Sequence, residues 1–191
     1  MREQEIIKDI ETAVNYIIRG GVILYPTDTI WGIGCDATID SAIKRVFSIK
    51  ERPESKAMIS LVGSVGQLKE FVNNIPDIAI REIENSSSPV TIIFDSPKGI
   101  SPFLIAEDGS AAFRIPQDDF TRELCLRAGK PLVSTSANIA GMPPPTTFSE
   151  INDALINKVD YVCEFGRERK GSTPSRILKI DNEGKITIIR P

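Results

Sequence analysis

Segments with helical periodicity alternate with short apolar runs along the whole chain, and this alternation is the strongest constraint on the fold. Apolar residues recur at helical spacing within residues 4–19, and Val22–Tyr25 follows as a short run typical of a buried strand. The succession continues to the last predicted strand at residues 185–190, without an internal repeat or a linker. Such alternation favours helices layered on a sheet. We therefore predict a single α/β domain over residues 1–191, built on a mixed β-sheet with flanking helices.

The pattern also gives approximate positions for the elements. Predicted helices cover residues 4–19, 40–50, 64–73, 76–85, 120–128 and 151–156. Predicted strands cover residues 22–25, 57–62, 90–94, 111–115, 131–134, 161–164, 175–180 and 185–190. Asp40 is expected to cap the second helix, and Thr147–Glu150 has the form of a capping box for the last one. Residues 26–37 are predicted as a loop, and Asp181–Gly184 indicates a hairpin turn.

The composition excludes several kinds of chemistry. The sequence contains no histidine, so Ser-His-Asp and Cys-His catalysis and histidine metal sites are ruled out. The three cysteines, Cys35, Cys125 and Cys163, match no metal-binding spacing, and their odd number argues against a disulfide framework. We expect a reducing cytoplasm. The first residues lack an apolar signal core, and the longest uncharged stretch, residues 131–149, carries four prolines, so neither secretion nor membrane insertion is expected.

Positive charge is concentrated in two segments. The whole chain has a formal net charge of −3, from 23 basic and 26 acidic residues. Residues 44–56 and 167–179 nevertheless carry five basic residues each, against two and one acidic residues. These segments could contact phosphates of a ligand or of RNA. No aromatic residue interleaves with the second segment, which weakens the case for a base-stacking surface.

Two polar loops follow predicted strands, where α/β sheets usually bind ligands. Ser134–Asn138 combines small hydroxyl and amide side chains, which let backbone amides approach an anion, although such loops are also common on plain surfaces. Residues 26–34 contain glycines that form neither the dinucleotide-binding fingerprint nor the Walker A loop. Trp31 in this loop is expected to pack against other side chains rather than to stack on a ligand.

Several cations need partners or ligands. Arg114 lies within an apolar predicted strand, so it requires either an internal carboxylate or an anionic ligand, and Arg190 is ambiguous in the same way. Lys50 and Arg52 are separated by one residue at a predicted helix end. They can converge on a phosphate or carboxylate, or simply face the negative end of the helix dipole.

Six motifs, each weak alone, occur in an order that covers nearly the whole chain. They are Tyr25–Thr29 with Gly32 and Gly34, Lys50-x-Arg52-Pro53, Pro89–Thr91, Phe113–Pro116, Ser134–Asn138 and Arg190-Pro191. Taken together, the chain resembles the YrdC-type threonylcarbamoyl-adenylate synthase family, in its short single-domain form. It departs from the usual family pattern at Ser88, Lys56–Met58, Pro144 and Arg176.

The resemblance implies a twisted sheet with a concave basic cavity, and a reaction that joins L-threonine, bicarbonate and ATP. The products would be threonylcarbamoyl-AMP and pyrophosphate, for use by the tRNA threonylcarbamoyl-transfer machinery in the cytoplasm. The substrates supply the nucleophile, so the absence of histidine is compatible with this chemistry. Mg²⁺ would accompany ATP and be held largely by phosphate oxygens, without a dedicated protein metal site.

The resemblance also assigns roles to individual residues. The residues that would contact threonine are Thr27, Arg114, Ser134 and Ser175. The residues that would contact ATP are Lys50, Arg52, Ser136, Asn138 and Arg190, of which Lys50 and Arg52 would also be catalytic.

Two other functions remain open at this stage. The basic segments would also suit an RNA-binding or ribosome-associated module of the same fold, with tRNA or double-stranded RNA as its partner. A paralogue that uses another carbamoyl-adenylate substrate is the second alternative. A pure RNA binder has no need of the hydroxyl-rich Ser134–Asn138 segment, which favours the enzyme.

Overall fold

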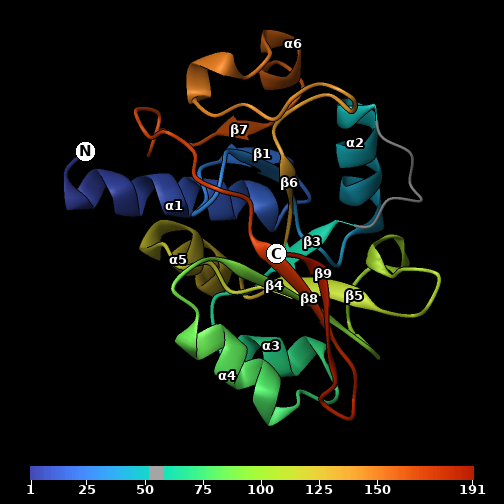
Figure 1. Cartoon of the computed structure of the whole chain (residues 1–191). Helices are drawn as coiled ribbons and strands as arrows, with labels where there is room; N and C mark the ends of the chain where they lie inside the picture. Colours follow the sequence, from blue (N-terminus) through green and yellow to red (C-terminus); the bar gives the residue numbers. More distant parts are fainter. Residues whose placement is uncertain (52–57) are drawn as a thin grey trace.

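A computed structural model describes residues 1–51 and 58–191, in which nine strands form one mixed sheet flanked by helices (Figure 1). The strand order is β7-β1-β2-β6-β3-β5-β4-β8-β9. The strands are β1 (Ile23–Tyr25), β2 (Gly32–Gly34), β3 (Ile59–Leu61), β4 (Val90–Phe94), β5 (Ala111–Arg114), β6 (Leu132–Ser136), β7 (Tyr161–Val162), β8 (Arg176–Ile180) and β9 (Ile186–Arg190). The predicted α/β class and mixed sheet are confirmed.

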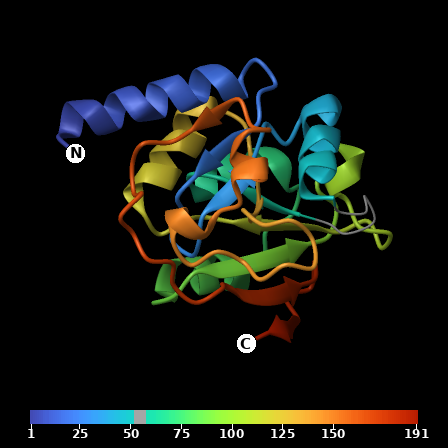
Figure 2. The ribbon, with the colours of Figure 1, turned by 90° about the horizontal axis from the view of Figure 1, so that it is seen from above.

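Three pairs of neighbouring strands, β1–β7, β3–β5 and β4–β8, run parallel, and the others run antiparallel. The hairpin predicted at Asp181–Gly184 joins β8 to β9, and Gly184 has the positive φ of 85° that such a turn requires. Figure 2 shows this hairpin at the side of the molecule farthest from α1, in agreement with the place of β9 at the end of the sheet.

The helices pack against both faces of the sheet (Figure 1). They are α1 (Glu3–Ile17), α2 (Asp40–Lys50), α3 (Val65–Phe71), α4 (Asp77–Asn85), α5 (Asp119–Ala128) and α6 (Asp153–Ile156), with 3₁₀ turns η1 (Pro102–Leu104) and η2 (Phe148–Glu150). Successive residues of a strand point to opposite faces. Ile23 and Tyr25 of β1 accordingly join the core beneath α1 and α5, whereas Leu24 joins the core beneath α2.

Farther along the sheet, only one face is covered by a helical core. Leu178 of β8 packs into a third cluster with Leu68 and Phe71 of α3. Its neighbour Ile177 points to the opposite face, where it lines a cavity. Among the described residues, the sheet therefore offers a face without a helical core at this end.

The predicted strands and the first five helices agree with the observed ones to within two residues. The loop predicted over residues 26–37 was wrong in part, because it contains β2. This strand is only three residues long and includes Gly32 and Gly34, so it has no strand-like composition. The sheet nevertheless needs Gly34: a Cβ there would lie 1.7 Å from the carbonyl oxygen of Val133 on β6.

Both predicted helix caps were also wrong. Asp40 is the first residue inside α2 rather than its cap, and its carboxylate accepts a hydrogen bond from Ser101. Thr147 precedes η2 rather than α6, and the Glu150 carboxylate accepts hydrogen bonds from the amide and hydroxyl of Thr146. The following helix, α6, spans four residues and is capped by Asn152.

All three cysteines are buried free thiols. Within the described ranges 1–51 and 58–191, no helix is both long and apolar enough to cross a membrane.

Asp9 fixes the position of α1 on the sheet. Its carboxylate is 4% exposed and accepts hydrogen bonds from the Tyr161 hydroxyl at 2.6 Å and from the backbone amides of Glu164 and Phe165 at 3.1 and 2.8 Å. One side chain thus satisfies three donors from the segment that begins with β7. Burial and the Asp9 charge both raise the pKa of Tyr161, so its hydroxyl remains a donor at neutral pH.

We predict that Asp9→Ala lowers the free energy of unfolding by about 2–4 kcal/mol, because it leaves buried donors without an acceptor. Urea unfolding at pH 7 measures the change. Glu11→Ala is the matched control on the same helix. Glu11 has 58% of its side chain exposed and pairs with Arg127 at 3.4 Å, so its loss should cost below about 1 kcal/mol. Equal effects of the two substitutions would contradict the anchoring role of Asp9.

Candidate functional site

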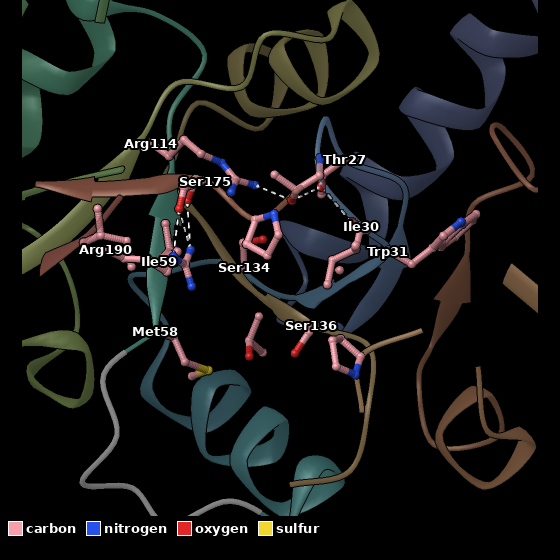
Figure 3. A pocket seen from close by; sticks show the side chains of 16 residues that line it. Thr27, Ile30, Trp31, Met58, Ile59, Arg114, Ser134, Ser136, Ser175 and Arg190 are labelled. Atoms are coloured by element: carbon pink, nitrogen blue, oxygen red, sulfur yellow. Dashed lines mark hydrogen bonds between the residues drawn. The ribbon is translucent and has the colours of Figure 1, made fainter. Parts of the chain in front are cut away.

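A cavity of about 350 Å³ opens on this uncovered face of the sheet (Figure 3). Six of the nine residues assigned by resemblance line it: Thr27, Arg114, Ser134, Ser136, Ser175 and Arg190. They come from the loop after β1, from β5, β6 and β9, and from the residue before β8. Segments more than 160 residues apart in sequence thus meet in one site, as Thr27 and Arg190 illustrate.

The loop between β1 and β2 forms one wall of the cavity. Thr27 donates its hydroxyl hydrogen to the carbonyl of Ile30 at 2.7 Å and accepts from the amide of Thr29 at 3.1 Å. The two threonine hydroxyls are 3.0 Å apart. These local bonds fix the loop while leaving hydroxyl oxygens on the cavity side.

Arg114 at the end of β5 has an internal partner. Its guanidinium lies 3.3 Å from the Asp28 carboxylate, and both side chains are 5% exposed. The other Asp28 oxygen accepts a hydrogen bond from the amide of Gln117 at 2.9 Å. The sequence left open whether Arg114 has an internal carboxylate or an anionic ligand as its partner, and the structure shows the internal carboxylate. Arg114 also lines the cavity, so a ligand anion can approach it there as well.

A second carboxylate lies close to this ion pair. Asp118 caps α5 by accepting from the amide of Thr121 at 3.0 Å. Burial raises the pKa of Asp118, the bonds from Thr121 lower it, and the charge of Asp28 adds a further rise. Asp118 thus lies near Asp28, the carboxylate that pairs with Arg114, and Arg114 itself also lines the cavity.

Ser175 and Arg190 form the opposite wall. Ser175 is 1% exposed, and its hydroxyl lies 2.8 Å from that of Thr91. The Arg190 guanidinium donates to the Ser175 carbonyl at 2.7 and 2.9 Å and to its hydroxyl at 3.3 Å. The charged residues among those that line the described part of the cavity are both arginines, Arg114 and Arg190.

Lys50 and Asn138 lie beside the cavity, outside the set of residues that line it. Lys50 ends α2 and is 2% exposed, and its ammonium group donates to the backbone carbonyls of Ser136 and, at 2.6 Å, Asn138. The Asn138 amide donates to the Met142 carbonyl at 2.6 Å. Lys50 thus ties α2 to the segment that carries Ser136. Arg52 lies outside the described residues, so its predicted role stays a prediction.

Sequence reasoning missed Asp28 and Thr29 as parts of this site. Both stand in the Tyr25–Thr29 motif, next to the assigned Thr27. The signal that could have found Asp28 is that it is the one acidic residue of this motif, while Arg114 is the one charged residue of an apolar strand. Trp31 is 2% exposed and packs against Phe148 with ring centroids 4.8 Å apart, which confirms its packing role.

Most cations of the second basic segment, residues 167–179, have partners within the protein. Arg167 pairs with Glu164, Arg176 with Glu82, and Lys179 with Asp95 and Asp108. Arg169 stacks over the Phe165 ring at 4.5 Å. Most of its charge is thus engaged within the protein, and an RNA partner remains a prediction.

Within the described part of the chain, no group of three or more His, Cys, Asp or Glu side chains is arranged to hold a metal ion. The fold and the cavity together define a class: a mixed-sheet α/β protein with a hydroxyl-lined site, flanked by arginines, that suits a ligand bearing anionic groups. The chain belongs to the Sua5/YciO/YrdC family, whose model, described as telomere recombination, matches residues 15–191.

Two curated relatives cover most of the chain. A protein of Photobacterium profundum named threonylcarbamoyl-AMP synthase is 31% identical over 159 residues, which are 82% of this chain and 86% of the relative. A protein of Methanocaldococcus jannaschii, whose name gives the same activity provisionally, is 34% identical over 189 residues, or 98% of this chain and 88% of the relative.

Solved structures show the same fold. Pyrococcus abyssi Sua5 complexed with L-threonine superposes with a TM-score of 0.84 at 24% identity, covering 95% of this chain and 53% of that one. The chain thus spans about half the length of this Sua5 protein. Escherichia coli YciO superposes with a TM-score of 0.81 at 24% identity, covering 95% of this chain and 87% of YciO.

We predict that Lys50→Met lowers the free energy of unfolding by about 2–4 kcal/mol, because its described charge-assisted hydrogen bonds to the partly buried carbonyls of Ser136 and Asn138 are lost while the side chain keeps its apolar length. Lys44→Met on the same helix is the matched control. Lys44 is exposed and contacts the Phe103 ring at 4.7 Å, so its replacement should cost about 1 kcal/mol or less. Urea unfolding measures both changes. A Lys50→Met variant with an unchanged free energy of unfolding would rule out the anchoring role.

Proposed function

We propose that this protein is an L-threonylcarbamoyladenylate synthase, a nucleotidyltransferase that forms threonylcarbamoyl-AMP and pyrophosphate from L-threonine, bicarbonate and ATP. The observation that carries the proposal is the meeting of Thr27, Arg114, Ser134, Ser136, Ser175 and Arg190 in one cavity. The names of relatives at 31% and 34% identity support it.

The threonine substrate would lie against the β1–β2 loop and β5. Arg114 suits its carboxylate, because a guanidinium donates two parallel hydrogen bonds to such a group. Thr27 and Ser134 offer hydroxyls from adjacent walls, and Ser175 offers one from the far side. The P. abyssi Sua5 structure with this fold contains L-threonine, which supports the same substrate here.

ATP would occupy the other end of the cavity. Ser136 and Arg190 also line the cavity, and Lys50, which donates to the carbonyls of Ser136 and Asn138, lies beside it. We assign Lys50 and Arg52 to the phosphates, where their charges would stabilise the transferring group and the leaving pyrophosphate. Mg²⁺ would bind together with ATP and be held mainly by phosphate oxygens, so it would not require a cluster of carboxylates from the protein.

The reaction needs positioning more than it needs a protein nucleophile. The threonine amine takes up bicarbonate with loss of water, giving a carbamate. An oxygen of this carbamate attacks the α-phosphorus of ATP, a new P–O bond forms, and the bond to pyrophosphate breaks. Arg114 and the hydroxyls of the cavity would hold the carbamate, while the phosphate-side cations neutralise charge.

The product is a mixed anhydride that water destroys, so an acceptor must consume it promptly. We assign that step to the tRNA threonylcarbamoyl-transfer machinery of the cytoplasm. Direct binding of tRNA or double-stranded RNA by this chain stays a separate prediction.

The test of the function is pyrophosphate release from ATP by the purified protein. We expect release only when L-threonine and bicarbonate are both present, with threonylcarbamoyl-AMP as the co-product in mass spectrometry. ATP turnover that is indifferent to threonine would contradict the proposal. A stronger response to another amino acid would identify a paralogue with a different substrate.

We also predict that Arg114→Lys raises the KM for L-threonine at least about tenfold, because lysine keeps the charge but cannot form the two-pronged contact to a carboxylate. The KM for ATP should change little. Arg127→Lys is the matched control, since Arg127 is exposed on α5 and pairs only with surface glutamates among its described ion pairs. An unchanged threonine KM in Arg114→Lys would remove Arg114 from the threonine site.

A further inference from the structure

The loop between β1 and β2 is a thin partition between two cavities. Its inner side lines the main cavity through Thr27, Thr29 and Ile30. Its outer side borders a second cavity of about 230 Å³, which residues 169–172 line from the other side. We call residues 169–172 the strap. Nothing in the function proposed above uses it.

The strap is bonded to the backbone of the loop. The Ser172 amide donates to the carbonyl of Thr29 at 2.5 Å, and the Ser172 hydroxyl donates to the carbonyl of Asp28 at 2.8 Å. On its other side, the amide of Gly171 donates to the carbonyl of Thr146 at 2.6 Å. The loop is therefore held between its own internal bonds and a segment more than 140 residues later in the sequence.

Gly171 is the point of closest approach. A Cβ at this position would lie 2.8 Å from the Ile30 Cγ2 atom, 3.1 Å from the Thr29 carbonyl oxygen and 3.2 Å from the Thr146 carbonyl oxygen. Two of these three neighbours are backbone atoms, which cannot turn aside as a side chain can. Any larger residue must push the loop inward or lift the strap.

We propose that Gly171 and Ser172 are positioning residues for the threonine substrate. They fix the carbonyls of Asp28 and Thr29, and this sets where the Thr27 and Thr29 hydroxyls and the Asp28 carboxylate lie. The carboxylate in turn orients Arg114. This inference rests on the proposed function for its substrate, but the contact between strap and loop stands on the structure alone.

The effect should be confined to the threonine side of the cavity. Ser136 lies in β6, where it pairs with Gly32 of β2, and its carbonyl accepts a hydrogen bond from Lys50. Neither Gly32 nor Lys50 contacts the strap through a described hydrogen bond. Ser175 follows the strap closely in sequence but has its own anchors: its hydroxyl pairs with Thr91, and the next amide, of Arg176, donates to the Pro89 carbonyl at 3.0 Å. A loosened strap therefore disturbs the loop first.

The sole tryptophan of the chain reports on this loop directly. Trp31 is 2% exposed, and it lines both cavities. Its fluorescence and its quenching by acrylamide measure whether the loop has opened, whatever the protein catalyses.

The experiment compares Gly171→Ala and Ser172→Ala with wild type, with Gly66→Ala as the matched control. A Cβ at Gly66 on α3 would meet only Ser64 Oγ, at an ordinary 3.5 Å. We expect Gly171→Ala to raise the KM for L-threonine about tenfold or more, and Ser172→Ala to raise it about fivefold, the worth of one hydrogen bond. In both variants the KM for ATP should stay within about twofold, and Trp31 should be quenched more readily.

Ser172→Thr keeps the hydroxyl and should restore the wild-type KM for threonine. Ser172 is exposed, so Ser172→Ala tests the proposal even where Gly171→Ala fails to fold. Unchanged threonine KM and Trp31 quenching would overturn the inference, and so would equal rises in both KM values. If wild type shows no threonine-dependent pyrophosphate release, the proposed function fails, and the Trp31 quenching still decides whether the strap holds the loop.

Discussion

The buried ion pair between Asp28 and Arg114 is the interaction on which the site depends. It joins the β1–β2 loop to the end of β5, two segments that the sheet order separates by β2, β6 and β3. A buried charge without its partner is strongly destabilising, whereas the pair itself adds little net stability. Its value here is geometric: two fixed charges define where the loop stands relative to the sheet. The Gln117 amide secures the carboxylate, so the pair cannot shift freely.

The open face of the sheet explains why polar residues gather here. Where α3 and α4 cover one face of β4 and β8, no helix of the described residues 1–51 and 58–191 covers the other face, and a strand must alternate between the two environments. Leu178 faces the core and Ile177 faces the cavity. Ser134 and Arg114 stand on this uncovered face from other strands. Small hydroxyl residues leave the volume empty, and arginines at its margins supply charge, so the cavity follows from the layering.

The sequence predicted the α/β class, most element positions and six of the residues that line the cavity, because periodicity and motif order are local signals. It missed β2, since two glycines in three residues carry no strand propensity and are required only by the close approach of Val133. It also left open the partner of Arg114, because an ion pair between residues 28 and 114 depends on tertiary structure. The role of Gly171 was equally hidden, since a lone glycine in a polar loop looks like ordinary flexibility until Ile30 and Thr146 are placed beside it.

A site without histidine must rely on the fixed geometry of its walls. Burial raises the pKa of Cys35, Cys125 and Cys163, so none of these thiols is a thiolate at neutral pH. Burial also raises the pKa of the Tyr25 hydroxyl, which therefore stays protonated. The substrates must then supply the reacting groups, and the protein contributes their alignment. Alignment is lost by small displacements, which makes rigid walls more important than any single side chain. The three ties on the cavity serve this need: the ion pair holds the loop from the sheet side, the strap holds it from outside, and Lys50 holds the Ser136 segment. The strap and Lys50 bond to backbone carbonyls, and Arg114 pairs with a buried carboxylate. These interactions can therefore position substrate-binding groups without filling the space that the substrates require.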